Sequence, residues 1–225
     1  MTEVQAVIDV RSRRFEREQL LASLATAASI DELRAIAPHL TFYVFGFQDM
    51  LRLTAELVRD PKLRELADGL RKDDAGHERW FWFDMTQLGC TPDVEWVLGR
   101  EHQATRDVTY SLMSELLRAD DDRVRMVFPL VLEATAAVFF PYVSNLLARA
   151  AGPRLLYFGD THRDAEAAHE LYEQARAQQL AAIEFDEPTY VAAVALVHRC
   201  FDLFERLFAH LEQQRQQQTR YALSA

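Results

Sequence analysis

The stretch MVFPLVLEATAAVFFPYVSNLL, residues 126–147, is the only long part of the sequence that is nearly free of charge. Its length approaches that of a membrane span. It contains Glu133, Pro129 and Pro141, however, and its flanks are not typical of a membrane anchor. We therefore expect it to form a helix buried in the centre of a soluble helical bundle.

The composition of the whole chain is that of a soluble helical protein. Its 225 residues fit one large domain, and 49% hydrophobic with 27% charged residues is ordinary for a protein with a sizeable core. Seven glycines and seven prolines are few, which favours long helices, and no segment alternates as a strand would. The net charge of −10 argues against a nucleic-acid partner, because binding phosphates needs a basic surface.

We expect neither a signal for export nor a membrane anchor in this sequence. The N-terminus has no cationic leader followed by an apolar run, so we expect no signal peptide. Cys90 and Cys200 form neither a disulfide framework nor a paired-cysteine metal motif. We therefore expect a cytoplasmic protein, since a reducing compartment is where unpaired cysteines are ordinary.

We expect residues 1–225 to form a single all-α domain. Cap and turn signals divide this domain into about seven helices. The breaks are marked by Asp60-Pro61, Gly89 and Gly152-Pro153, and Ser29 with Glu32 matches a capping box. The expected helices cover about residues 3–27, 38–59, 61–88, 100–117, 123–151, 154–183 and 189–217, with an N-terminal helical unit of 1–28 and a fraying polar tail at 218–225.

Glu133 is the one charged residue inside the apolar stretch. Desolvating a carboxylate there is costly unless something cationic or a hydrogen-bond donor meets it. A metal ion would serve, and so would a tyrosine or arginine of a neighbouring helix. Glu133 alone does not decide between these two explanations.

A second feature is YFGDTHRDAEAAH, residues 157–169. As a helix, this segment places His162, Glu166 and His169 at i, i+4 and i+7, on one face within two turns. Two imidazoles and a carboxylate in this arrangement suit a divalent transition metal. Three residues can match a pattern by chance, so the interpretation needs further ligands from elsewhere in the chain.

A third feature, Asp73-Asp74-Ala75-Gly76-His77, offers such ligands. In a continuous helix either carboxylate can share a face with His77. The alternatives are a solvated acidic turn for Asp73 and a buried His77 that is hydrogen-bonded to a carboxylate. With Glu133 and the second feature, the inventory becomes three histidines and three carboxylates from three helices, as in the di-iron and di-manganese sites of helical bundles.

These residues resemble the haem-oxygenase-like di-iron oxidases and oxygenases. The family's second core helix carries a Glu in a LEAT-like context, which Leu132-Glu133-Ala134-Thr135 matches. Its third carries H-x3-D-x2-H, which His162-x3-Glu166-x2-His169 after Tyr157-Phe158 resembles. The family's first core helix carries a Glu and a His, and His77 with the downstream Leu88-Gly89 looks like this element. The motifs cover roughly residues 73–169, with 56 residues from His77 to Glu133 and 29 from Glu133 to His162.

Two positions depart from the family pattern. Glu166 stands where the family usually has Asp, which conserves the chemistry but reaches one methylene further. Leu70 occupies the position, seven residues before the histidine, where the family often has Glu. Asp74 is the best substitute by helix angle. The resemblance therefore makes Asp74 the expected ligand and Asp73 the second choice.

The resemblance implies both a fold and an activity. It predicts a haem-oxygenase-like bundle that binds two Fe(II) ions per chain and uses O₂ to oxidise a small organic substrate derived from an amino acid or a fatty acid. Family outcomes include N-oxygenation, C–C cleavage and oxidative decarboxylation, and biosynthesis of a specialised metabolite is the expected setting. An external electron donor is compatible with this chemistry, and apolar helix faces are compatible with a homodimer.

Two other kinds of function remain open for the same fold class. One is a metal-free or haem-dependent enzyme; a haem oxygenase needs only a proximal histidine and would leave Glu133, Glu166 and two of the three histidines unexplained. A non-catalytic helical binding protein predicts that His77, Glu133 and His169 do not converge.

Several residues outside the motifs have less specific interpretations. Asp84 shares the face of His77 and could orient an imidazole, or serve as a surface or capping residue. Cys200 and most of the aromatic residues are expected to belong to the core. We expect satisfied structural or surface histidines at His39, His102, His198 and His210.

Overall fold

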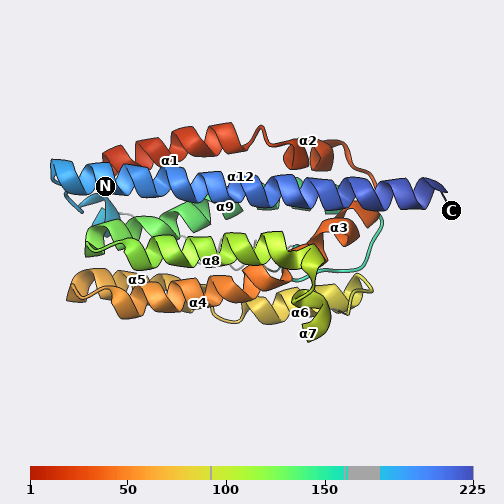
Figure 1. Cartoon of the computed structure of the whole chain (residues 1–225), viewed down its shortest axis with the longest axis horizontal. Coiled ribbons are helices and arrows are strands. Elements are labelled where there is room, and N and C mark those ends of the chain that lie inside the picture. Colours follow the sequence, from red (N-terminus) through yellow and green to blue (C-terminus); the bar gives the residue numbers. More distant parts are fainter. Residues whose placement is uncertain (92, 160, 162–177, 225) are drawn as a thin grey trace.

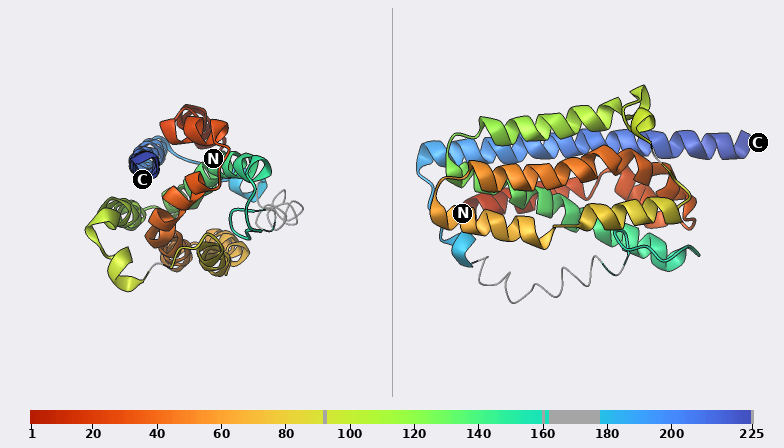
Figure 2. Two further views of the ribbon diagram at one scale, coloured as in Figure 1. Left: turned by 90° about the vertical axis from the view of Figure 1, so that its right-hand side faces the viewer. Right: turned by 90° about the horizontal axis from the view of Figure 1, so that it is seen from below.

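The computed structural model describes residues 1–91, 93–159, 161 and 178–224, with side chains as far as Gln218. All regular secondary structure in this part of the chain is helical, which confirms the all-α prediction. The long helices lie side by side in a bundle (Figure 1). Seen end on, α1 and α2 lie on one side of the bundle and α4 and α5 on the opposite side (Figure 2).

In chain order, the helices are α1 (Thr2–Phe15), α2 (Gln19–Thr26), α3 (Asp31–Ile36), the 3-10 helix η1 (Ala37–Leu40), α4 (Thr41–Leu57), α5 (Pro61–Asp73), α6 (His77–Gln87), α7 (Val94–Val97), the 3-10 helix η2 (Arg100–His102), α8 (Gln103–Arg118), α9 (Asp122–Arg149) and α12 (Glu187–Ser224). Residues 178–181 are helical as well.

The apolar stretch forms the central helix, α9. It contacts α1, α2, α4, α5 and α12, and Val127, Val131 and Leu132 are fully buried. Pro129 and Pro141 lie inside the helix without ending it. α9 is long and apolar enough to cross a membrane, yet 56% of its apolar window is buried within the protein, as in the core helix of a bundle.

The N-terminal segment is two helices, whereas the sequence predicted one over residues 3–27. Glu18 is extended, with φ −60° and ψ 140°, so the chain turns between α1 and α2. The turn allows each helix to pack separately. Phe15 at the end of α1 contacts Phe201 and Phe208 of α12, while α2 buries Leu21 and contacts α9.

The helix expected over residues 61–88 is also divided. α5 ends at Asp73 and α6 begins at His77, with Gly76 between them at φ 98°. Glycine adopts this left-handed conformation readily because it has no Cβ. Gly89, at φ 75°, follows the end of α6 as predicted. The break therefore falls beside the first group of predicted ligands.

The last helix, α12, extends to Ser224 instead of ending near Gln217, and its C-terminal end projects beyond the other helices (Figure 1). It contacts α1, α2, α3, α8 and α9. Its polar contacts include Arg215, which pairs with Glu32 at 2.8 Å. Glu32 thus contacts α12 instead of completing the capping box that the sequence suggested.

Candidate functional site

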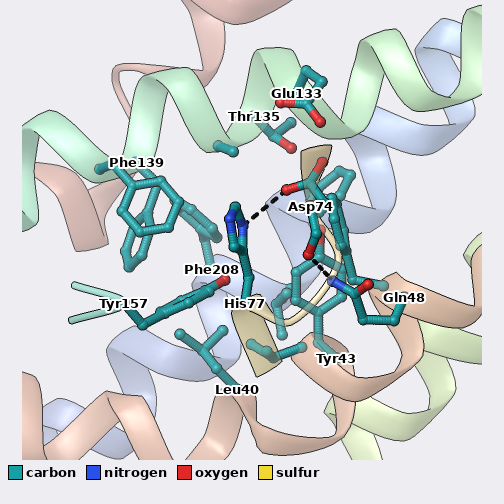
Figure 3. A pocket seen from close by; sticks show the side chains of 16 residues that line it. Leu40, Tyr43, Gln48, Asp74, His77, Glu133, Thr135, Phe139, Tyr157 and Phe208 are labelled. Carbon is teal, nitrogen blue, oxygen red and sulfur yellow. Dashed lines mark hydrogen bonds and ion pairs between the residues drawn. The ribbon is translucent and has the colours of Figure 1, made fainter. Parts of the chain in front are cut away.

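The site is a cavity that brings together side chains from α4, the α5–α6 junction, α9 and α12 (Figure 3). Its volume is about 70 Å³. Three of the lining residues are sequence-predicted ligands, namely Asp74, His77 and Glu133.

Asp74 and His77 meet across the junction between α5 and α6. Their Oδ1 and Nδ1 atoms are 3.1 Å apart. The Gln48 side chain of α4 donates to the backbone carbonyl of Asp74 at 2.9 Å and so supports the turn. The predicted Asp74–His77 pairing is present. It results from the left-handed turn at Gly76 and not from two side chains on one face of a continuous helix.

The imidazole of His77 is 8% exposed and is held from two directions. Asp74 contacts its Nδ1, and the Trp80 ring stacks on it at 4.5 Å with an interplanar angle of 22°. A neutral imidazole that donates from Nδ1 carries its lone pair on Nε2. This is a common arrangement for metal-bound histidines with a carboxylate partner.

Glu133 approaches the same end of the cavity from α9. Figure 3 shows it, together with Thr135, on the helix that faces Asp74. Burial raises the pKa of the Tyr43 phenol well above its usual range, and nearby Tyr157, Glu133 and Asp74 raise it further. Tyr43 is therefore a neutral hydroxyl at physiological pH, in the same electrostatic environment as the two carboxylates.

The rest of the cavity wall is mainly aromatic. Phe139 contacts Phe140 and Phe208 with ring centres 5.6 Å apart in each pair, and Phe140 contacts Tyr157 at 5.4 Å. Phe47 and Phe204 complete the aromatic part of the lining. The cavity is thus acidic at one end and apolar at the other, which suits a small organic molecule that reacts at its polar end.

Asp84 binds the backbone of residues 156–158, on either side of the cavity-lining Tyr157. It is fully buried on α6 and accepts backbone N–H groups from Leu156 at 2.6 Å and Phe158 at 2.9 Å. Burial raises the pKa of its carboxyl group to about 6, although these hydrogen bonds oppose the shift. The structure therefore gives Asp84 backbone partners, and neither an imidazole nor a surface position.

The remaining predicted ligands divide into two groups. His162, Glu166 and His169 lie outside the described residues. Asp73 is half-buried at the end of α5, and Asp74 borders the cavity. Among the residues that the structure describes, no three His, Cys, Asp or Glu side chains are grouped to hold a metal ion.

Some residues of the cavity carried no signal in the sequence. Gln48 and Tyr43 belong to α4, which contains none of the predicted ligand motifs. Tyr157 could have been found from its place just before the His162 motif. Cys200 is fully buried, which confirms its assignment to the core.

Three of the four histidines outside the motifs form a cluster between η1, η2 and α12. The ring centre of His39 is 4.5 Å from that of His102 and 5.5 Å from that of His210. Each ring has a buried nitrogen without a hydrogen-bond partner among the described residues, Nδ1 of His39 and Nε2 of the other two. The expectation of a satisfied histidine is therefore not met within the described residues at these three positions, while His198 contacts Arg11 at 3.1 Å.

No known family model matches the chain, and no curated protein matches it significantly.

Proposed function

We propose that the chain is an O₂-dependent non-haem di-iron oxidoreductase that oxidises a small organic substrate bound in the cavity. The observation that supports this most directly is the position of Asp74, His77 and Glu133, which come from the α5–α6 junction, the start of α6 and α9, and line one cavity. Nitrogen and carboxylate oxygen are the ligand atoms from which helical bundles build di-iron sites. The proposal adds His162, Glu166 and His169 as further ligands, on the basis of their sequence spacing.

The residues around the acidic end have complementary tasks in this proposal. Asp74 and Glu133 would contribute oxygen ligands, and His77 would contribute Nε2 while Asp74 fixes the orientation of its ring through Nδ1. Two bound Fe(II) ions would supply the electrons and the coordination positions for activating O₂. Gln48 would keep the α5–α6 turn in place through the carbonyl of Asp74.

The aromatic wall would bind the substrate and exclude water. Phe139 and Phe208 would pack on the apolar part of the molecule, so that its reacting end points toward Asp74 and Glu133. The Tyr43 hydroxyl, neutral at physiological pH, is suited to donate a hydrogen bond to a polar group there. Excluding water protects an oxidising centre from side reactions.

The narrower features of the proposal come from the family resemblance. They are a substrate derived from an amino acid or a fatty acid, oxidation by N-oxygenation, C–C cleavage or oxidative decarboxylation, and a role in making a specialised metabolite in the cytoplasm. An external donor would supply electrons where the reaction needs them, and the active form would be a monomer or a homodimer.

The test is anaerobic loading with Fe(II), followed by metal analysis and exposure to O₂. We expect about two irons per chain, the number that a six-ligand bundle site holds, and a transient visible absorption band when O₂ is added. His77→Ala and Glu133→Gln should lose iron, whereas Asp107→Asn, an exposed change on α8, should keep it.

The same experiment distinguishes the alternatives. A chain that takes up no iron at micromolar concentration is not a di-iron enzyme. Tight binding of haem with a Soret band would favour the haem-dependent alternative. Ligand binding without metal or O₂ consumption would favour a metal-free enzyme or a helical binding protein.

A further inference from the structure

Asp84 occupies an unusual position for a carboxylate. It lies seven residues after His77 on α6, so the two side chains project from nearly the same face two turns apart. His77 lines the cavity, whereas Asp84 accepts the N–H groups of Leu156 and Phe158. One face of α6 therefore contacts both the predicted ligand pocket and the segment that leads toward the next ligand motif.

A buried carboxylate of this kind is not explained by stability alone. Asp84 is 0% exposed, and its raised pKa means that burying the charge costs more than the backbone hydrogen bonds return. A neutral side chain of similar shape would avoid that cost. The carboxylate fixes the position of the backbone, because it accepts the N–H groups of Leu156 and Phe158, the two residues on either side of a third.

The flanked residue is Tyr157, whose side chain lines the cavity. Its ring packs edge-on against Phe81 at 5.3 Å and Phe140 at 5.4 Å. Phe158 is fully buried and contacts Phe81 at 5.9 Å. Figure 3 shows Tyr157 directed into the cavity near His77. With the backbone fixed on both sides, the direction of the Tyr157 side chain is fixed as well.

We infer that Asp84 is a positioning residue, whose carboxylate fixes the backbone at Leu156–Phe158 and thereby holds Tyr157 as a wall of the cavity. The relevance of this wall to a substrate rests on the proposed function. The geometric role itself does not, since it involves only contacts between α6 and residues 156–158.

The test is hydrogen exchange in the metal-free full-length protein, with Asp84→Asn. The amide keeps the shape of the side chain but replaces one acceptor oxygen with a donor, so at least one N–H loses its partner. We expect the amides of Leu156 and Phe158 to exchange at least ~10-fold faster, as a local opening. Asp107→Asn, the same change at an exposed position on α8, should alter the exchange of neither amide.

Two further measurements address Tyr157 and the wild-type protein. Nuclear Overhauser contacts of the Tyr157 ring with Phe81 and Phe140 should weaken in Asp84→Asn and persist in Asp107→Asn. In the wild type, the amide protons of Leu156 and Phe158 should shift with pH at the same midpoint as the side-chain carboxyl carbon of Asp84. The second measurement needs only the wild type, so it does not depend on whether Asp84→Asn folds.

The inference is overturned if the variant keeps full protection at Leu156 and Phe158, or if those amides in the wild type do not follow the Asp84 titration. Either result is independent of iron. Failure of the wild-type chain to bind Fe(II) would overturn the proposed function and leave these measurements valid.

Discussion

The cluster of His39, His102 and His210 predicts that the protein loses stability as the pH falls below neutral. In the unfolded chain, His39 and His102 have an ordinary pKa of about 6.5. Burial, together with neighbouring histidine charges, lowers the pKa in the folded state to about 3 for His39 and to about 4 for His102, where Glu101 opposes the shift. Below pH 6.5 the unfolded state binds protons that the folded state does not. The free energy of unfolding therefore decreases as the pH is lowered toward 4.

The magnitude follows from the same pKa values. In this window each histidine lowers the free energy of unfolding by about 1.4 kcal/mol per pH unit. Two histidines would therefore lower it by about 4 kcal/mol between pH 6.5 and 5. His39 is only partly buried, which reduces its share. Asp84 acts in the opposite direction, because its raised pKa of about 6 lets the folded state take up a proton first. The expected net loss from these three groups is about 2–3 kcal/mol.

Urea unfolding at pH 7 and pH 5 measures this loss. The double variant His39→Phe/His102→Phe keeps aromatic rings in the cluster and removes these two titrating groups but not Asp84, so its stability should fall by about 3–4 kcal/mol less than that of the wild type. His198→Gln changes an exposed histidine and should leave the wild-type pH dependence intact. An equal loss in the wild type and the double variant would refute the reasoning.

Three further predictions concern the acidic end of the cavity. Gly76→Ala puts a Cβ at φ 98° and should cost about 1–2 kcal/mol in urea unfolding, unlike Ala75→Ser; an unchanged stability would contradict the strain argument. Asp74→Asn should lower the iron content of anaerobically loaded protein more than Asp73→Asn, because Asp74 borders the cavity; equal effects would contradict its assignment. Fe(II) at 100 times its Kd should stabilise the wild type by about 2.7 kcal/mol, seen as a higher Tm, and Glu133→Gln much less; no shift in the wild type would count against a metal site.

Local signals predicted the helical architecture well. The charge-free stretch around Glu133 indicated the central helix, and Asp60 caps α5 by accepting the N–H groups of Lys62 and Leu63. These features act within a few residues of the chain, so they can be recognised without knowing the fold. The same reasoning failed at Glu18 and Gly76, where we expected continuous helices and the chain turns instead.

The sequence also identified Asp74, His77 and Glu133 as candidates, because a carboxylate in an apolar helix and an Asp-x2-His spacing are visible in one dimension. It did not determine how they meet. The Asp74–His77 contact depends on the left-handed Gly76 and on Gln48 from another helix. Helical periodicity predicts neither of these features.

Only the tertiary structure determined what surrounds these residues. Tyr43, Tyr157 and Phe208 line one cavity although they are far apart in the chain, because α4, α9 and α12 pack around a common interior. The partners of Asp84 lie 72 and 74 residues away. The sequence by itself determined the all-α class and the chemical inventory, because caps, prolines and apolar spacing act locally. Packing between distant helices decided which of these groups meet, and which polar atoms are left buried without a partner.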